Sequence, residues 1–163
     1  QPMQVEPRKE HHWLQKLVGE WSVEMEPPEG SGEPPAKQEG TETVRSIGGL
    51  WTVGDGRGTM PGGGEMTSVM TLGYDPQRGK FRGTFIASMM TFLWVYEGSL
   101  DAAGRVLTLD TEGPSMDPAS GGMAKYQDVI EFLSDDHRTL TGRIKMPDGN
   151  WVQFMRAHYR RKK

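Results

Sequence analysis

The chain has 163 residues, enough for one domain with a buried core, and its formal net charge of -3 provides no field that would attract nucleic acid or an anionic membrane. It contains no cysteine, which excludes disulfides and thiolate metal sites, while 22 glycines and 11 prolines are typical of a β domain with many turns. No apolar run reaches the roughly 20 residues that span a bilayer, and we expect a cytoplasmic protein.

The segment from His12 to Trp21 predicts a short helix that passes directly into a strand. Its apolar residues share one stripe at helical spacing and are Trp13, Leu14, Leu17 and Val18. Gly19 suits the left-handed C′ position that ends many helices. From Trp21 onward apolar and polar residues alternate, which is the period of a strand with one buried face. We expect residues 1–6 to be a flexible tail and residues 7–163 to form one domain.

Nine further segments of strand character follow, separated by turn signals rich in glycine, proline and aspartate. They lie near residues 37–47, 50–60, 65–74, 80–88, 92–100, 105–113, 124–134, 139–146 and 150–161. A meander of ten antiparallel strands leaves two open edges, and closure into a barrel removes both. The sequence therefore predicts an all-β fold, a ten-stranded antiparallel barrel with a short N-terminal helix capping its base.

The connections between these strands alternate between the two ends of the predicted barrel. Those at the helix end are short, whereas those at the far end include the long segments 26–36 and 114–123. Tight turns suit a closed base and adaptable loops suit an opening, so we expect the far end to be the mouth. Eight of the 11 methionines lie on or beside far-end connections: Met25, Met60, Met66, Met89, Met90, Met116, Met123 and Met146. They predict a flexible apolar rim, although gap-filling near a barrel end accounts for them equally well.

The predicted first strand opens with Gly19-x-Trp21 after a short helix, which resembles the opening signature of the lipocalins and related calycin barrels. In those proteins the tryptophan sits at the barrel base beneath a basic side chain of the last strand. The resemblance implies that Arg160 or Arg161 makes this cation–π contact here.

Other short motifs extend this similarity over nearly the whole chain from His11. They are HxWLxxLVGEW, Gly48-Gly49-Leu50-Trp51, Leu72-Gly73-Tyr74-Asp75 with Lys80-Phe81, Tyr96-Glu97-Gly98, Glu112-Gly113-Pro114 and Tyr159-Arg160-Arg161-Lys162. Together they resemble an uncharacterised bacterial family of unknown function that is expected to share a lipocalin-like, calycin-type barrel. The resemblance implies a fold and no activity. With ten strands and no helix after the barrel, the chain is more similar to fatty-acid-binding and nitrobindin-like barrels than to true lipocalins.

The last strand has two possible registers, which the preceding turn decides. With a two-residue loop of Asp148-Gly149, Met146 pairs with Trp151, and the inward residues are Trp151, Gln153, Met155, Ala157 and Tyr159. With a type I turn over residues 147–149 and a glycine bulge, Met146 pairs with Asn150, and the inward residues are Val152, Phe154, Arg156 and His158. Because proline favours position i+1 of a type I turn, we predict the second register.

In this register Arg156 and His158 reach the cavity and hold the polar head of a ligand, similar to the arginine and polar neighbour that anchor a carboxylate in fatty-acid-binding barrels. The alternative is that both face solvent or join a structural ion pair. Aromatic residues of the middle strands line the interior, as core or as cavity wall, because ten strands enclose a wide space. The predicted ligand-binding residues are Trp21, Met25, Met66, Phe85, Met89, Phe92, Trp94, Tyr96, Arg156 and His158.

The sequence contains no GxSxG elbow and no metal-ligand spacing among its four histidines, which are His11, His12, His137 and His158. Four carboxylates could pair inside the barrel: Glu97, Asp110, Glu112 and Asp128. We expect a non-enzymatic module without cofactor that binds a small apolar or amphipathic molecule, and we expect no nucleic-acid or membrane partner. Two alternatives stay open: a haem-binding or small-molecule enzyme barrel that uses His158, and a filled barrel that acts through its surface or as a homodimer.

Overall fold

The computed structural model describes residues 5–27, 39–60, 62–117 and 121–163. One helix, α1 (Lys9–Gln15), precedes ten strands. The strands are β1 (Gly19–Met25), β2 (Glu39–Ile47), β3 (Trp51–Thr59), β4 (Glu65–Asp75), β5 (Lys80–Ala87), β6 (Trp94–Leu100), β7 (Val106–Pro114), β8 (Met123–Ser134), β9 (His137–Lys145) and β10 (Trp151–Arg161).

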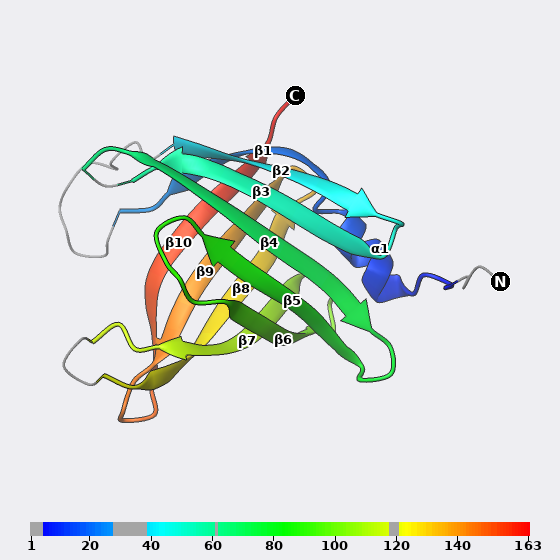
Figure 1. Cartoon of the computed structure of the whole chain (residues 1–163). Helices are drawn as coiled ribbons and strands as arrows, with labels where there is room; N and C mark the ends of the chain where they lie inside the picture. The colour runs from blue at the N-terminus through cyan, green and yellow to red at the C-terminus, as the bar shows by residue number, and fades with distance from the viewer. Residues whose placement is uncertain (1–4, 28–38, 61, 118–120) are drawn as a thin grey trace.

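Every strand pairs antiparallel with the next one, and β1 also pairs with β10, so the sheet closes on itself (Figure 1). Closure gives each strand two neighbours and satisfies its backbone polar groups. The predicted fold class, a ten-stranded antiparallel barrel with a short N-terminal helix, is confirmed. The start of the predicted tail, most of the predicted loop 26–36, the beginning of the second predicted strand and part of the loop 114–123 lie outside the described residues.

The helix is shorter than the sequence predicts. It ends at Gln15, and Gly19, which we expected to end the helix, instead opens β1. The backbone φ of Gly19 is 137°, which residues with a side chain rarely adopt. A Cβ at this position would lie 2.5 Å from Nη1 of Arg161. The glycine is therefore needed for the close approach of an arginine of the last strand, and its assignment to the helix end was wrong.

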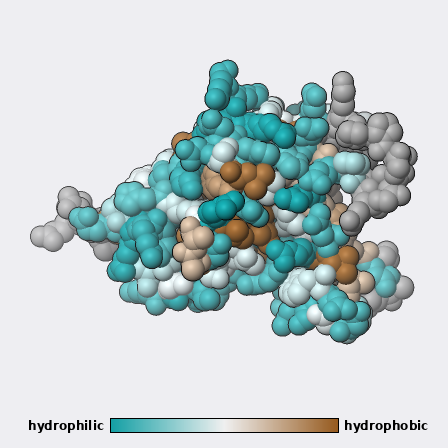
Figure 2. Space-filling model, turned by 180° about the vertical axis from the view of Figure 1, so that it is seen from behind, coloured by the Kyte–Doolittle hydropathy of each residue, from teal (hydrophilic) through white to brown (hydrophobic). Residues whose placement is uncertain are grey.

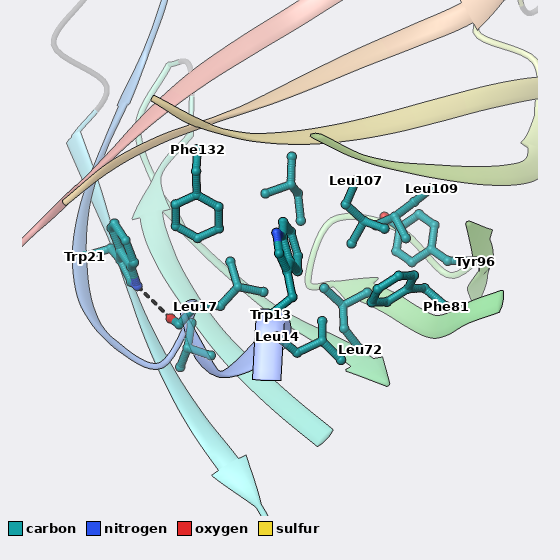
Figure 3. Packing of buried hydrophobic residues seen from close by; sticks show 12 residues of the cluster. Trp13, Leu14, Leu17, Trp21, Leu72, Phe81, Tyr96, Leu107, Leu109 and Phe132 are labelled. Carbon is teal, nitrogen blue, oxygen red and sulfur yellow. Dashed lines mark hydrogen bonds between the residues drawn. The ribbon is translucent and has the colours of Figure 1, made fainter. Parts of the chain in front are cut away.

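The half of the barrel next to α1, here called the base half, has a densely packed apolar core. Trp13 and Leu14 project from α1 into this core, as Figure 3 shows. The Trp13 ring meets Phe81 and Phe132 edge to face, at centroid distances of 6.1 and 5.5 Å. The buried residues of the core are Trp13, Leu14, Leu17, Trp21, Val44, Leu72, Phe81, Tyr96, Leu107, Leu109, Ile130 and Phe132. Burial of the helix side chains makes α1 an integral part of the fold.

Two hydrogen bonds from side chains of α1 fix the helix across the base. The indole Nε1 of Trp13 donates to the carbonyl oxygen of Gly104, in the turn between β6 and β7, at 2.8 Å. The buried ring of His11 donates through Nε2 to the carbonyl oxygen of Tyr74, at the end of β4, at 3.0 Å. These contacts span the helix end of the barrel, so α1 closes the base as predicted.

Trp21 completes the base beside the helix. Its indole Nε1 donates to the carbonyl oxygen of Leu17 at 2.8 Å, and the ring is fully buried. The guanidinium carbon of Arg161 lies 4.3 Å from the ring centroid. The predicted cation–π contact with the last strand is therefore confirmed, and Arg161 provides it. Arg160 faces outward, where its guanidinium lies 3.4 Å from the carboxylate of Glu24.

The outer surface is not uniform around the barrel. Between β2 and β6 it carries exposed apolar side chains, which are Ile47, Trp51, Ile86 and Val95. The side seen from behind in Figure 2 is mainly hydrophilic, with a small apolar group near its middle. In the described part of the chain, no helix has the length and apolar character needed to cross a bilayer.

Candidate ligand cavity

In the half of the barrel farther from α1, here called the mouth half, the inward positions of one strand are all glycine. Successive inward positions of β3 are Gly54, Gly56 and Gly58, because alternate residues of a strand point to the same face. Gly40 of β2 lies opposite Gly58 and Ser68 of β4 lies opposite Gly56. The other inward neighbours of these glycines are larger and are Glu42, Val44, Met66 and Met70. We call the three glycines of β3 the glycine wall.

A row of aromatic rings lies on the far side of the interior. It runs from Phe92 in the loop before β6 through Trp94 and Tyr126 to Phe154, with ring centroids 5.0, 5.1 and 6.0 Å apart. Tyr126 belongs to β8, which is five strands from β3 in either direction around the barrel. Each neighbouring pair is edge to face, the arrangement that aromatic pairs favour. We call this set the aromatic row.

Many side chains that point into the mouth half are only partly buried. Half-buried inward residues of this region include Val23, Met25, Met70, Phe85, Leu140, Ile144 and Met155. In the base half the corresponding inward residues, such as Leu72, Leu107 and Ile130, are fully buried. Three of the half-buried residues, Met70, Phe85 and Leu140, also pack against the core of the base half. The interior of the mouth half is therefore less completely filled than that of the base half, and we call it the candidate cavity.

An ion pair forms part of the cavity floor. Arg138 of β9 donates through Nη2 to Oε1 of Glu42 on β2 at 2.6 Å, and the two side chains are 4% and 13% exposed. The guanidinium carbon lies 4.6 Å from the ring centroid of Trp21 and 4.1 Å from that of Tyr159. The Arg138 charge is thus balanced by one carboxylate and by two ring faces.

A void of about 20 Å³ borders this ion pair. Its lining includes Glu42, Thr52, Met70 and Arg138. This volume is sufficient for one water molecule with polar partners and is too small for an organic ligand. Gly54 of the glycine wall also lines this void, so the ion pair lies where the two halves of the barrel meet.

The second polar group of the floor is a carboxyl–phenol pair. The hydroxyl of Tyr96 on β6 donates to Oδ2 of Asp128 on β8. Burial raises the pKa of the Asp128 carboxyl, and the hydrogen bond from Tyr96 opposes this increase only in part. Burial also raises the pKa of Tyr96 and of Tyr159, so both phenols are neutral hydrogen-bonding groups at physiological pH.

The turn before β10 has the form that the sequence predicts. The N–H of Met146 donates to the carbonyl oxygen of Asn150 at 2.8 Å, and Gly149 has a φ of 91°. A second irregularity then follows within the strand. Between Gln153 and Met155 the register against β9 shifts by one residue, which is a β-bulge.

This bulge at Phe154 reverses the faces of the rest of β10. Beyond it Ala157 and Tyr159 point into the barrel, while Arg156 and His158 point outward. The prediction that Arg156 and His158 face the cavity is therefore wrong, although the turn on which it depended is correct. One extra residue inverts every later side chain, because the side-chain period of a strand is two.

Outside the barrel, His158 belongs to a chain of polar contacts. Its Nε2 lies 2.6 Å from Oε2 of Glu26, and its Nδ1 lies 2.9 Å from Nε2 of His137. Nε of Arg156 lies 3.5 Å from the same Glu26 oxygen. Partial burial, together with the positive charge of Arg160 and other neighbours, lowers the pKa of His137. With both ring nitrogens engaged on the outer face, His158 cannot ligate a haem inside the barrel.

The other predicted ligand-binding residues fall into three groups. Trp21 and Tyr96 are buried, Trp21 in the packed base and Tyr96 in the floor beside Asp128. Those that face the cavity or its rim from the strands are Met25, Met66, Phe85 and Trp94. Met89 and Phe92 lie in the loop between β5 and β6, where Phe92 joins the aromatic row and Met89 is exposed.

Several residues of the cavity were missed by the sequence reasoning. Arg138 falls in the turn predicted between the segments near 124–134 and 139–146, although it shares the inward phase of Leu140 in β9. Asp128 was named as one of four carboxylates and was not placed, yet it shares the phase of Tyr126. Glu42 sits in the inward phase of Val44. A charged residue at an apolar position of an alternating strand was the signal that could have found all three.

The structure contains no set of three or more histidine or carboxylate side chains, among the residues it describes, that could hold a metal ion. Two hydrogen bonds join polar groups of the floor, Tyr96 to Asp128 and Arg138 to Glu42, while Nε of Arg138 is buried without a hydrogen-bond partner in the described part of the chain. What this part of the chain offers chemically is therefore hydrogen bonding, charge and apolar contact with a bound molecule.

The geometry defines a closed β-barrel with a packed base half and a less completely filled mouth half. Residues 6–161 match DUF1579, a family described as protein of unknown function, and the chain belongs to this family. No curated protein matches the chain.

Among solved structures, the chain is similar to a redesigned β-barrel, b11L5F_LGL, with 13% identity, a TM-score of 0.48 and coverage of 92% of this chain and 95% of that chain. It is also similar to EF1p2_mFAP2b bound to DFHBI, with 13% identity, a TM-score of 0.47 and coverage of 93% and 98%. A third similar structure is the redesigned β-barrel mFAP0 bound to DFHBI, with 15% identity, a TM-score of 0.44 and coverage of 90% and 100%.

Proposed function

We propose that this protein binds one small apolar or amphipathic molecule, non-covalently, inside the mouth half of the barrel. The observation that supports the proposal is the less completely filled interior between the glycine wall and the aromatic row. A cavity with apolar walls and a few polar groups at one end is the usual form of a small-molecule site.

The predicted residues Met25, Met66, Phe85 and Trp94 have a place in this proposal as contacts to the ligand body. Phe85 and Trp94 are paired neighbours on β5 and β6, so they present a continuous apolar surface. Met25 and Met66 lie at the mouth ends of β1 and β4. Their flexible side chains adapt to ligands of different shape.

A substitution in the glycine wall tests the proposal. At Gly58 an added Cβ would lie 3.8 Å from Cα of Gly40 and 3.9 Å from Cε of Met66, which are ordinary contacts. Gly58→Leu therefore fits the fold while its outer carbons fill the cavity. The matched control is Thr59→Leu, which places the same side chain on the outer face of the same strand.

The experiment is a thermal-shift screen with fatty acids, fatty alcohols, haem and aromatic metabolites, together with native mass spectrometry of the purified protein. A ligand raises the unfolding temperature by mass action. We expect at least one class to stabilise the wild-type protein and the Thr59→Leu variant but not the Gly58→Leu variant. Equal stabilisation of all three proteins, or of none, contradicts binding in the cavity.

A second candidate function is association through the outer face. The observation that favours it is the exposure of Ile86 and Val95 on the neighbouring strands β5 and β6, at 49% and 46%, and of Trp51 on β3, at 45%. A homodimer formed through this face predicts a concentration-dependent mass in sedimentation velocity that Ile86→Lys abolishes. A constant monomer mass contradicts it.

A further inference from the structure

Few charged side chains of the ten strands point into the barrel. They are Glu42, Asp128, Arg138 and Arg161. Their distribution indicates which kind of polar head a bound molecule can carry, because a charge buried without a partner is strongly unfavourable.

Each of the two cations already has a carboxylate partner, although Nε of Arg138 has no hydrogen-bond partner among the described residues. The Arg138 guanidinium is held by Glu42 and lies against two aromatic rings, and its side chain is 4% exposed. Arg161 lies at the base, where Nη1 donates to the carbonyl oxygen of Val18 at 2.8 Å and Nε lies 3.2 Å from Oδ1 of Asp136. A carboxylate that entered the cavity would find no unpaired positive charge on these strands.

Asp128, in contrast, has hydrogen-bonding capacity left. Its Oδ2 accepts from Tyr96, and its Oδ1 has no partner among the residues that the structure describes. A carboxylate offers about four acceptor sites, and the phenol uses one. The residue is half-buried on the inner face, so a molecule in the cavity can reach it.

The aromatic row lies at a suitable distance from this acceptor. Tyr126 is two residues before Asp128 on β8, and β8 runs from the mouth to the base, so the ring lies about 6.6 Å nearer the mouth. A ring system that rests against the aromatic row can therefore carry a short polar group down to the carboxyl. A cationic head also gains from nearby ring faces.

We propose that the ligand has an aromatic or other apolar body and a polar head, an amine or a hydroxyl, that donates a hydrogen bond to Asp128. This inference rests on the proposed function, that the cavity holds a ligand. Carboxylates are disfavoured, since they would meet Asp128 and Glu42 without a free cation. The preference is opposite to the carboxylate anchoring that the sequence suggested for Arg156 and His158.

Three probes with the same ring test this proposal: 1-naphthylmethylamine, 1-naphthylmethanol and 1-naphthoate. Their affinities are measured by isothermal titration at pH 7 with the wild-type protein and with the Gly58→Leu, Asp128→Asn and Asp110→Asn variants. Asp110 is exposed on the outer face of β7 and bonds to Gln127, so it is the matched control.

We expect the amine and the alcohol to bind at least about tenfold more tightly than naphthoate, since a charge-assisted or buried hydrogen bond typically has that effect. Asp128→Asn should lower the affinity for the amine by about tenfold and bring naphthoate closer to the alcohol, whereas Asp110→Asn should change neither. The order of the three probes on the wild-type protein tests the proposal without any variant.

Three results would overturn the proposal. If naphthoate binds as tightly as the amine, and Gly58→Leu abolishes both, the cavity binds ligands but the inferred head group is wrong. If Asp128→Asn keeps the wild-type order of the probes, Asp128 is not the acceptor. If no probe binds, or if Gly58→Leu leaves all three affinities unchanged, the proposed function fails together with the inference.

Discussion

The two halves of the barrel are built from the same ten strands and have opposite interiors. In the base half, inward leucines and aromatic rings pack against Trp13 and Leu14 of α1, and their side chains are buried. In the mouth half the inward positions of β3 are glycines, and side chains such as Phe85 remain half-buried. The two halves differ in the volume of their inward side chains and not in the pairing of their strands.

This comparison shows how one closed sheet can combine stability with capacity for a ligand. Ten strands enclose more space than side chains fill unaided, so a helix is needed to close one end. Once α1 and its tryptophan fill the base, the glycines of β3 leave the other end open. The polar groups Glu42, Arg138 and Asp128 lie where the two halves meet.

The largest effect is expected from emptying the base. Trp13→Ala removes a ring that contacts Phe81 and Phe132 and a hydrogen bond to Gly104, and we expect a loss of about 3–5 kcal/mol in the free energy of unfolding. Phe85→Ala in the mouth half should cost less than about 2 kcal/mol, because the side chain is only half-buried. Urea unfolding of both variants measures the difference. Equal losses would mean that the mouth half is packed like the base.

Breaking the ion pair where the halves meet should have the next largest effect. Arg138→Met leaves Glu42 without its partner, and we expect a loss of about 3 kcal/mol. The double variant Glu42→Leu with Arg138→Met removes both charges and should recover most of this loss. A double-mutant cycle from chemical denaturation measures the coupling. Additive losses in the double variant would show that the two charges do not interact.

Predictability from the sequence also differs between the two halves. The helical spacing of Trp13, Leu14 and Leu17 predicts a buried stripe, because large apolar side chains on one face of a helix are stabilised by burial. The strands followed from alternation and turn residues, and the ring of Trp21 with an arginine of the last strand followed from a family resemblance. The helical spacing and the strand alternation are signals that are local along the chain.

The mouth half could not be predicted to the same extent, because its geometry depends on one residue of register. Nothing in the local sequence of β10 distinguishes a regular strand from one with a bulge at Phe154, so Arg156 and His158 were assigned to the wrong face. The pairing of Arg138 with Glu42 joins residues 96 positions apart, which only the closed barrel brings together. Contacts of that kind are set by topology and have no local signature.

A smaller effect is expected for the charge on the cavity floor. Burial raises the pKa of folded Asp128 above its ordinary value of 3.8, so the folded chain holds this proton more tightly than the unfolded chain does. The resulting stabilisation is present below pH 3.8 and is lost as the pH rises through the raised pKa. At pH 7 the buried carboxylate therefore destabilises the fold, and Asp128→Asn should raise the unfolding temperature.

The gain from Asp128→Asn should shrink towards zero as the pH falls below the raised pKa of Asp128, where the wild-type carboxyl is protonated. Differential scanning calorimetry from pH 4 to pH 8 measures this dependence, with Asp110→Asn as the exposed control. A loss of stability at pH 7 would show that the ionised carboxylate is favourably accommodated, and a gain independent of pH would show that its charge is not the cause.

The smallest effect concerns the outer face at His137. Its pKa is lowered from 6.5 by partial burial and by neighbouring positive charge, so the unfolded chain takes up the proton at higher pH than the folded chain does. Stability should therefore fall as the pH decreases through 6.5 towards the lowered pKa. His137→Gln should flatten this part of the curve of unfolding temperature against pH. An unchanged slope in the variant would assign the pH dependence to another group.

The central claim is that the mouth half of the barrel is hollow and accepts a small molecule, and methionine methyl spectra test it most directly. In a protein labelled with 13C at its methionine methyl groups, the inward Met25, Met70 and Met155 report on the cavity, and the exposed Met116 and Met123 report on the outside. On addition of 1-naphthylmethanol, ring-current shifts are expected at the three inward methyl groups with one saturable binding curve. Shifts confined to Met116 and Met123, or no shifts at all, would contradict the account.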